Sequence, residues 1–202
     1  MNLVKLPSPL KTVWKFVLTQ LSKIKWNRSA AVLNRGIYYK LSETDHDQIR
    51  QHLKDEYCII LTRRSNHLST YMTWLGSWIV NRRSTHYTHA LMNIEGEMTG
   101  HLGYQLIEAT SKGVHFSTFM EVFNCDSVAL LRPKNVTAEQ WNHVMAMVKI
   151  QLGKDYDLFF DFSDDQTLSC VEMVLIGLQS LPGHEEHFGE LLAEIQLSGN
   201  KL

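Results

Sequence analysis

Two short strand-like segments joined by a glycine-containing loop constrain the fold of this 202-residue chain more than any other feature. Residues 85–94, THYTHALMNI, and 103–109, GYQLIEA, are rich in β-branched and aromatic side chains, and the loop between them contains two glycines. This pattern is typical of a β-hairpin. The runs at 58–62, CIILT, and 126–133, which ends in proline, indicate further strands. The chain is therefore expected to contain an antiparallel sheet.

Helical segments surround these strands in the sequence. The clearest is 137–153, where Thr137 is a good N-cap, Gln140 follows three residues later, and apolar side chains recur at helical spacing. Because the helices are mostly segregated from the antiparallel strands along the chain, the order predicts an α+β fold with a central sheet packed against helices. The other expected helices span 42–57, 68–80, a segment beginning near Cys170, and 183–197.

The charge distribution divides the chain into two parts. Residues 1–42 contain eight Lys or Arg and no acidic residue, whereas the remainder has 20 − 8 = 12 basic and 21 acidic residues. A basic arm on an acidic body indicates either docking of the arm on the body or attraction to an anionic partner. We therefore expect an N-terminal arm, 1–42, and one folded domain, 43–202.

The arm contains an amphipathic segment, 11–26, with Val13, Val17, Leu21 and Ile24 on one helical stripe. Such a helix either packs on the body or lies on an anionic membrane surface. No apolar run reaches the roughly 18 residues of a membrane span, and lysines interrupt the core that a signal peptide would need. We expect a cytoplasmic protein, with peripheral membrane attachment as the alternative. No nucleic-acid partner is expected, since a basic, aromatic surface is lacking outside the arm.

The three cysteines, Cys58, Cys125 and Cys170, favour free thiols in a reducing compartment. Cys58 lies in an apolar strand-like run and is expected to be a core residue. Cys170 lies at the first turn of an apolar helix, where the helix N-terminus favours the thiolate. It would be a nucleophile if a histidine lies beside it, and one more small buried side chain otherwise.

A register in the hairpin selects one of the ten histidines. If His89 pairs with Glu108, then Leu91 pairs with Leu106 and the loop spans 95–102. Directly opposed residues place their Cβ atoms about 4.5–5.5 Å apart, so the carboxylate could orient the imidazole. A one-residue slip would separate them, and a chance polar pair on a solvated face is the alternative. No CxxC or HExxH motif occurs, so neither a metal nor another cofactor is expected.

The stretches IILTRRSNHLS, THYTHALMNI, LIEATSKGV and LGKDYDLFFDFSDDQTLSCVEMV lie between about residues 45 and 180. Together they resemble the circularly permuted NlpC-type branch of the papain-like hydrolases. This branch includes bacterial permuted papain-like amidases and, as distant relatives, lecithin:retinol acyltransferase-like proteins. The resemblance implies a permuted papain-like fold with Cys170 as nucleophile, His89 as its base and Glu108 as the third polar residue.

The chain departs from this family on both sides of the cysteine. The family often has a tyrosine before the nucleophile and a serine after it, whereas this chain has Ser169 and Val171. If that tyrosine binds the oxyanion, then Ser169, a backbone N–H or Tyr87 takes its place here. Glu172 matches the family and is expected to be structural.

The expected activity is that of a cysteine hydrolase that cleaves an amide or ester bond through an acyl-enzyme intermediate. Its substrate would be a small amide or ester, or a peptide. One alternative is a lipid-directed acyl hydrolase or acyltransferase at a membrane surface. The other is a non-catalytic binding module on the same fold.

Overall fold

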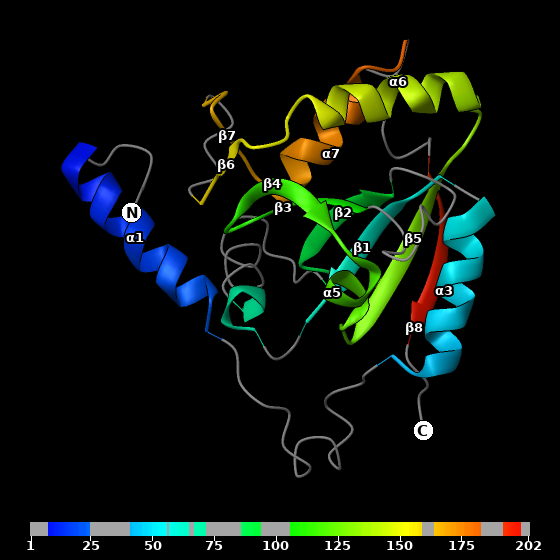
Figure 1. The fold of residues 1–202 in the computed structure, drawn as a ribbon, viewed down its shortest axis with the longest axis horizontal. Coiled ribbons are helices and arrows are strands. Elements are labelled where there is room, and N and C mark those ends of the chain that lie inside the picture. Colours follow the sequence, from blue (N-terminus) through cyan, green and yellow to red (C-terminus); the bar gives the residue numbers. More distant parts are fainter. Residues whose placement is uncertain are drawn as a thin grey trace.

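The computed structural model describes residues 8–24, 41–55, 57–64, 67–71, 86–93, 106–158, 164–182 and 192–198. Its centre is a six-stranded antiparallel sheet in the order β4-β3-β2-β1-β5-β8 (Figure 1). The expected α+β architecture with a central antiparallel sheet is therefore confirmed. The strands are β1 (Ile59–Arg63), β2 (His89–Asn93), β3 (Leu106–Thr110), β4 (Gly113–Ser117), β5 (Ser127–Pro133) and β8 (Leu192–Ser198).

Helices cover both faces of the sheet (Figure 1). Strand side chains alternate between the faces, so each face of the sheet has its own apolar core. The helices on one face are α6 (Ala138–Lys149) and α7 (Cys170–Gln179). Those on the other are α3 (Glu43–Asp55) and α5 (Phe119–Phe123).

Helix α6 agrees with the sequence expectation at its first turn. The Thr137 hydroxyl accepts from Gln140 N at 3.2 Å, and the Gln140 side chain accepts from Thr137 N at 2.9 Å. This reciprocal pair is the predicted capping box. Trp141, Val144 and Val148 are buried, as their helical spacing predicted.

Helix α3 confirms the predicted helix at 42–57. For the helix predicted at 68–80, residues 68–71 are helical, and the rest lies outside the described residues.

The predicted closing helix over 183–197 is wrong where the structure describes it. Residues 192–198 form strand β8, which pairs with β5 from Ser127↔Ser198 to Pro133↔Leu192. The apolar residues Ala193, Ile195 and Leu197 alternate with polar ones, a period that suits a strand. Pairing with the edge of β5 outweighs the helical preference of this segment.

The predicted register of β2 and β3 is also wrong, by two positions. Glu108 pairs with Leu91, and Leu106 pairs with Asn93. An even offset preserves the face on which each side chain lies. His89 and Glu108 are therefore diagonal neighbours on one face, a separation that long side chains can bridge. The predicted loop, 95–102, lies outside the described residues.

Strand β4, which the sequence reading did not identify, forms a tight hairpin with β3. Gly113 begins it with φ +88° and pairs with Thr110. A Cβ at Gly113 would lie 2.5 Å from Lys154 O, so the close approach also requires glycine. Val114 N donates to Lys154 O at 2.8 Å. This contact fixes the chain just before the short strand β6 (Asp155–Tyr156).

The N-terminal helix α1 (Ser8–Ser22) lies at one side of the molecule (Figure 1). Leu18 is buried, and Leu68 N donates to Ile24 O at 3.0 Å, which ties the chain just after α1 to the body. Val13 and Ile24, two of the four residues expected on the apolar stripe, are exposed. Among the described residues, no helix is long and apolar enough to cross a membrane.

Candidate active site

The first turn of α7 fixes the position of Cys170. Ser169 is the N-cap, and its hydroxyl accepts from Glu172 N at 3.3 Å, while Ser169 N donates to Glu172 Oε2 at 2.7 Å. Cys170 is thus the first residue of the helix, where the positive end of the helix dipole favours a thiolate. Glu172 belongs to this cap, which confirms the structural role expected for it.

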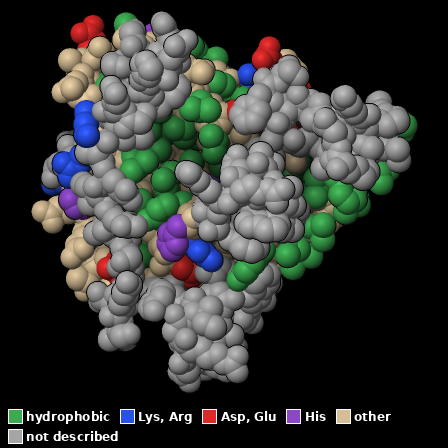
Figure 2. All heavy atoms as spheres, turned by 180° about the vertical axis from the view of Figure 1, so that it is seen from behind, with side chains coloured by type: hydrophobic (Ala, Val, Ile, Leu, Met, Phe, Trp, Pro, Cys, Tyr) green, Lys and Arg blue, Asp and Glu red, His purple; other side chains and the backbone are tan. Residues whose placement is uncertain are grey.

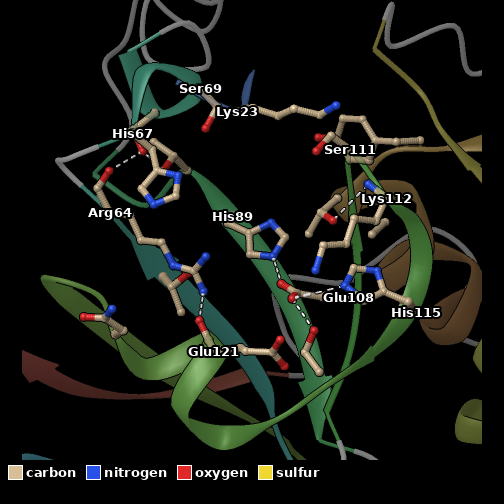
Figure 3. A pocket seen from close by; sticks show the side chains of 18 of the residues that line it. Lys23, Arg64, His67, Ser69, His89, Glu108, Ser111, Lys112, His115 and Glu121 are labelled. Carbon is tan, nitrogen blue, oxygen red and sulfur yellow. Dashed lines mark hydrogen bonds and ion pairs between the residues drawn. The ribbon is translucent and has the colours of Figure 1, made fainter. Parts of the chain in front are cut away.

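His89 connects Cys170 to Glu108. Its Nε2 lies 2.6 Å from Glu108 Oε2 (Figure 3). The imidazole also hydrogen-bonds to the Cys170 side chain. Since Nε2 faces the carboxylate, Nδ1 is the nitrogen left for the thiol. The structure therefore brings the three predicted residues together, in the predicted order.

The opening of the sheet at the start of β2 makes this contact possible. Pairing of β2 with β3 begins at Leu91↔Glu108 and does not extend to His89 and Ala90. Leu91 and Glu108 lie on one face of the sheet. Helix α7 packs against the other face. The Cys170 side chain accepts a hydrogen bond from Ala90 N at this opening. The Cys170 sulfur, which comes from the α7 side of the sheet, thereby reaches the His89 imidazole, which lies on the other side.

Glu108 is held by groups besides His89. It is only 4% exposed. Its Oε1 accepts a hydrogen bond from the Ser117 hydroxyl and lies 3.7 Å from His115 Nε2 (Figure 3). A buried carboxylate with several donors has a fixed orientation, so it can fix the ring that it contacts.

The electrostatics of the site favour a thiolate and an imidazolium. Burial lowers the pKa of His89, but the hydrogen bonds and charges of Cys170 and Glu108 outweigh it and raise that pKa to about 9. Burial raises the pKa of Glu108, but the hydrogen bond and charge of His89, with smaller effects of Ser117 and Arg64, lower it to about 2. Glu108 is therefore ionised at neutral pH and stabilises the charged ring.

The pKa of Cys170 is lowered from its ordinary value. Burial acts in the opposite direction, but the hydrogen bond and the charge of His89 outweigh it, with help from Ala90 N–H and the Tyr156 side chain. A thiol becomes an effective nucleophile when its thiolate is populated near neutral pH.

Tyr156 is a site residue that the sequence reading missed. Burial, and then the charge and hydrogen bond of Cys170, raise the pKa of Tyr156 well above its ordinary value. It therefore stays protonated and donates its O–H to the sulfur. Strand β6 pairs in parallel with β7 (Thr167–Leu168), with Tyr156 opposite Leu168, two residues before Cys170. The available signal is the segment KDYDLFFDFSDD, which contains this tyrosine and resembles the permuted amidases.

The structure gives other contacts to the two side chains suggested as oxyanion donors. The Ser169 hydroxyl caps α7, and the residue is fully buried. The Tyr87 ring lies edge-on to His86, with 4.9 Å between ring centroids. The donor roles of Ser169 and Tyr87 stay predictions, and the Tyr156 hydroxyl, which hydrogen-bonds to the Cys170 sulfur, is a further candidate.

The other two cysteines lie in the apolar core between the sheet and α3 and α5. Cys58 is 1% exposed and Cys125 is fully buried. The expectation that Cys58 is a core residue is confirmed. Both thiols are free, as is that of Cys170.

A pocket of about 700 Å³ leads to the catalytic candidates. Its lining includes His89, Glu108 and Tyr156, and thus reaches the two side chains that hydrogen-bond to the Cys170 sulfur. Its other walls come from β1, the β3–β4 hairpin, α5 and Lys23, which follows α1 (Figure 3). A small acyl compound is of a size to enter it.

No protein-family model matches the chain, and comparisons with curated proteins and with solved structures found no match either.

Proposed function

We propose that this protein is a cysteine hydrolase of the permuted papain-like type, which cleaves an amide or ester bond through an acyl-enzyme intermediate. The observation that carries the proposal is the double contact of His89, with Cys170 and with Glu108. A lone buried cysteine would need neither an oriented imidazole nor a carboxylate behind it. The permuted papain-like assignment rests on the sequence resemblance and agrees with a helical cysteine facing a strand histidine.

The first half of the proposed reaction forms the acyl-enzyme. The Cys170 thiolate attacks the carbonyl carbon, and an S–C bond forms while the carbonyl oxygen becomes an oxyanion. Tyr156 O–H and Cys170 N–H donate to this oxyanion. When the intermediate collapses, the C–N or C–O bond breaks, and the His89 imidazolium gives its proton to the leaving group.

The second half releases the acid. Water attacks the thioester carbonyl, and neutral His89 accepts one of its protons. The C–S bond then breaks, the carboxylic acid leaves, and the thiolate–imidazolium pair is restored. Glu108 keeps Nε2 of His89 engaged throughout, so Nδ1 remains directed at the reacting atoms.

A second candidate is an acyl hydrolase or acyltransferase that works on lipids at a membrane surface. It is favoured by exposed apolar side chains on α1, where Val13 is 61% and Phe16 65% exposed. Apolar side chains gather along the edge of the molecule that carries this helix (Figure 2). An amphipathic helix with exposed apolar residues and a basic surrounding sequence suits an anionic membrane.

The chemical proposal is tested by covalent capture with an electrophilic acyl probe, read by mass spectrometry of the cysteine peptides. Cys170→Ala is expected to abolish capture, whereas Cys58→Ala and Cys125→Ala are expected to retain it. The latter two are matched controls because they remove equally buried thiols from the other core. Equal labelling of all three cysteines would contradict the proposal and favour a non-catalytic binding module.

A further inference from the structure

The lining of the pocket carries more positive than negative charge outside the catalytic residues. Lys23, Arg64 and Lys112 all line it, and among the described lining residues Glu121 is the one acidic side chain besides Glu108. The three basic residues lie just after α1, just after β1 and in the β3–β4 turn. Segments far apart in the sequence thus place their cations around one cavity (Figure 3).

The negative side chains of the pocket already have partners of their own. Glu108 is engaged by His89 and Ser117. Glu121 closes the cap of α5, where its Oε2 accepts from Thr118 N at 2.9 Å and from the Thr118 hydroxyl at 3.0 Å. The carboxylates are thus directed toward histidine, hydroxyl and backbone donors.

Among the described residues, the two lysines have no such close partner, although the charge of Lys112 acts on Glu121 through space. Within the described part of the chain, no ion pair neutralises Lys23 or Lys112. In Figure 3, the Lys23 side chain extends along the rim toward Ser111, and Lys112 extends inward toward His89 and Glu108. The Arg64 guanidinium donates to the backbone carbonyls of Glu121 and Val122, which fix its position without cancelling its charge.

We propose that the pocket selects an acyl substrate that carries an anionic group, a carboxylate or a phosphate, close to the scissile carbonyl. This inference rests on the proposed function and names the substrate class of that site. The anion would lie among Lys23, Lys112 and Arg64, while its carbonyl reaches Cys170 between His89 and Tyr156. The arm then has a direct part in the site, because Lys23 belongs to it.

The test compares two alkylating reagents of similar size, anionic iodoacetate and neutral iodoacetamide, on the Cys170 thiol of the full-length protein. We expect Cys170 to prefer iodoacetate, relative to a free thiol in the same buffer. Lys23→Gln and Lys112→Gln should each lower the iodoacetate-to-iodoacetamide rate ratio by about three-fold, and the double variant should lower it by about ten-fold. This is the size of effect expected when a unit positive charge some 8 Å from the iodoacetate carboxylate is removed from a hydrated site. Both lysines are exposed, so both variants are expected to fold.

Lys149→Gln is the matched control, since Lys149 is exposed on α6 and does not line the pocket. It should leave the ratio unchanged. An identical ratio in all variants, with rapid labelling by iodoacetamide, would overturn the anionic substrate and leave the thiol chemistry standing. Labelling of Cys170 no faster than that of Cys58 by either reagent would overturn the proposed function, and this inference with it.

The same assay separates a carboxylate from a phosphate. Acetate or inorganic phosphate is added at constant ionic strength, with iodoacetamide as the label. The anion that slows labelling of Cys170 at the lower concentration identifies the group, and the double lysine variant should lose that protection. Protection by neither anion would contradict an anion site.

Discussion

At the scale of single residues, the Cys170 sulfur is held by three groups from two places in the chain. His89 and Ala90 lie at the start of β2, and Tyr156 lies in β6. The contacts of His89 and Ala90 favour the thiolate before substrate binds. In the proposed reaction, the Tyr156 hydroxyl acts later, when negative charge moves from sulfur to oxygen.

Replacement of Tyr156 by phenylalanine should therefore slow acyl transfer more than alkylation. We expect Tyr156→Phe to slow acylation of Cys170 by a factor of roughly 10²–10³, as for loss of one oxyanion donor. Iodoacetamide alkylation develops no oxyanion and should slow much less. Rates with both reagents, followed by mass spectrometry, measure the difference.

Tyr57→Phe is the control for this prediction, because the Tyr57 ring packs 5.9 Å from that of Trp141, in the core. It should leave both rates unchanged. An equal loss of acylation and alkylation in Tyr156→Phe would mean that Tyr156 acts on the sulfur alone.

The residues of the site were predictable from the sequence to different degrees. Cys170, His89 and Glu108 could be selected because a helix start and a hairpin are local patterns. A two-residue error in register also leaves every strand residue on its correct face of the sheet. Tyr156 could not be assigned a role in this way. Its place depends on the parallel pairing of β6 with β7, which no local pattern in these two-residue strands encodes.

At the scale of elements, α6 and α7 begin with the same device. Each has a hydroxyl N-cap joined in a capping box to a side chain three residues later, Thr137 with Gln140 and Ser169 with Glu172. The two helices pack together on one face of the sheet. Only α7 carries a site residue in its first turn.

Loss of the Ser169 or the Thr137 hydroxyl should lower the stability of the fold equally, but only loss of the Ser169 hydroxyl should change the reactivity of Cys170. We expect Ser169→Ala and Thr137→Ala each to lower the free energy of unfolding by about 1 kcal/mol. Ser169→Ala should also slow alkylation of Cys170, because it loosens the turn that holds the sulfur near His89. Urea unfolding and iodoacetamide labelling give the two quantities. Equal slowing by Thr137→Ala would show that labelling reports global stability instead.

The two strands that the sequence did not predict, β8 and β4, were missed for different reasons. Strand β8 pairs with β5, some 60 residues earlier in the chain, and its own residues also suit a helix. Strand β4 follows β3 after a two-residue turn, and its five residues are too few for a clear alternation. The capped helix α6, in contrast, was predicted because its signals are local.

At the scale of the whole molecule, the arm and the body meet at the pocket. Lys23 lines the pocket, and Ile24 O accepts from Leu68 N. The other side of α1 leaves Val13 and Phe16 exposed. Helix α1 thus has one side toward the body and exposed apolar side chains on the other.

The membrane alternative predicts a specific loss of vesicle binding. If α1 inserts its exposed side chains, the protein should float with anionic phospholipid vesicles, and Phe16→Asp should abolish flotation, since a charge opposes insertion. Ile150→Asp is the matched control, because Ile150 is 70% exposed at the end of α6 and Phe16 is 65% exposed on α1. No flotation of the wild-type protein, or equal flotation of both variants, would contradict a membrane role for α1.

The claim on which the whole account rests is that His89 holds Cys170 as a thiolate. The most direct measurement is the rate of iodoacetamide alkylation of Cys170 as a function of pH, in the wild-type protein and in His89→Ala. Because His89 lowers the pKa of Cys170, the wild-type rate should reach half its maximum well below the ordinary thiol pKa of about 8.5. The midpoint should rise to 8.5 or above in His89→Ala, where burial acts unopposed by the imidazolium. The same midpoint in both proteins, at or above that of an ordinary thiol, would contradict the account.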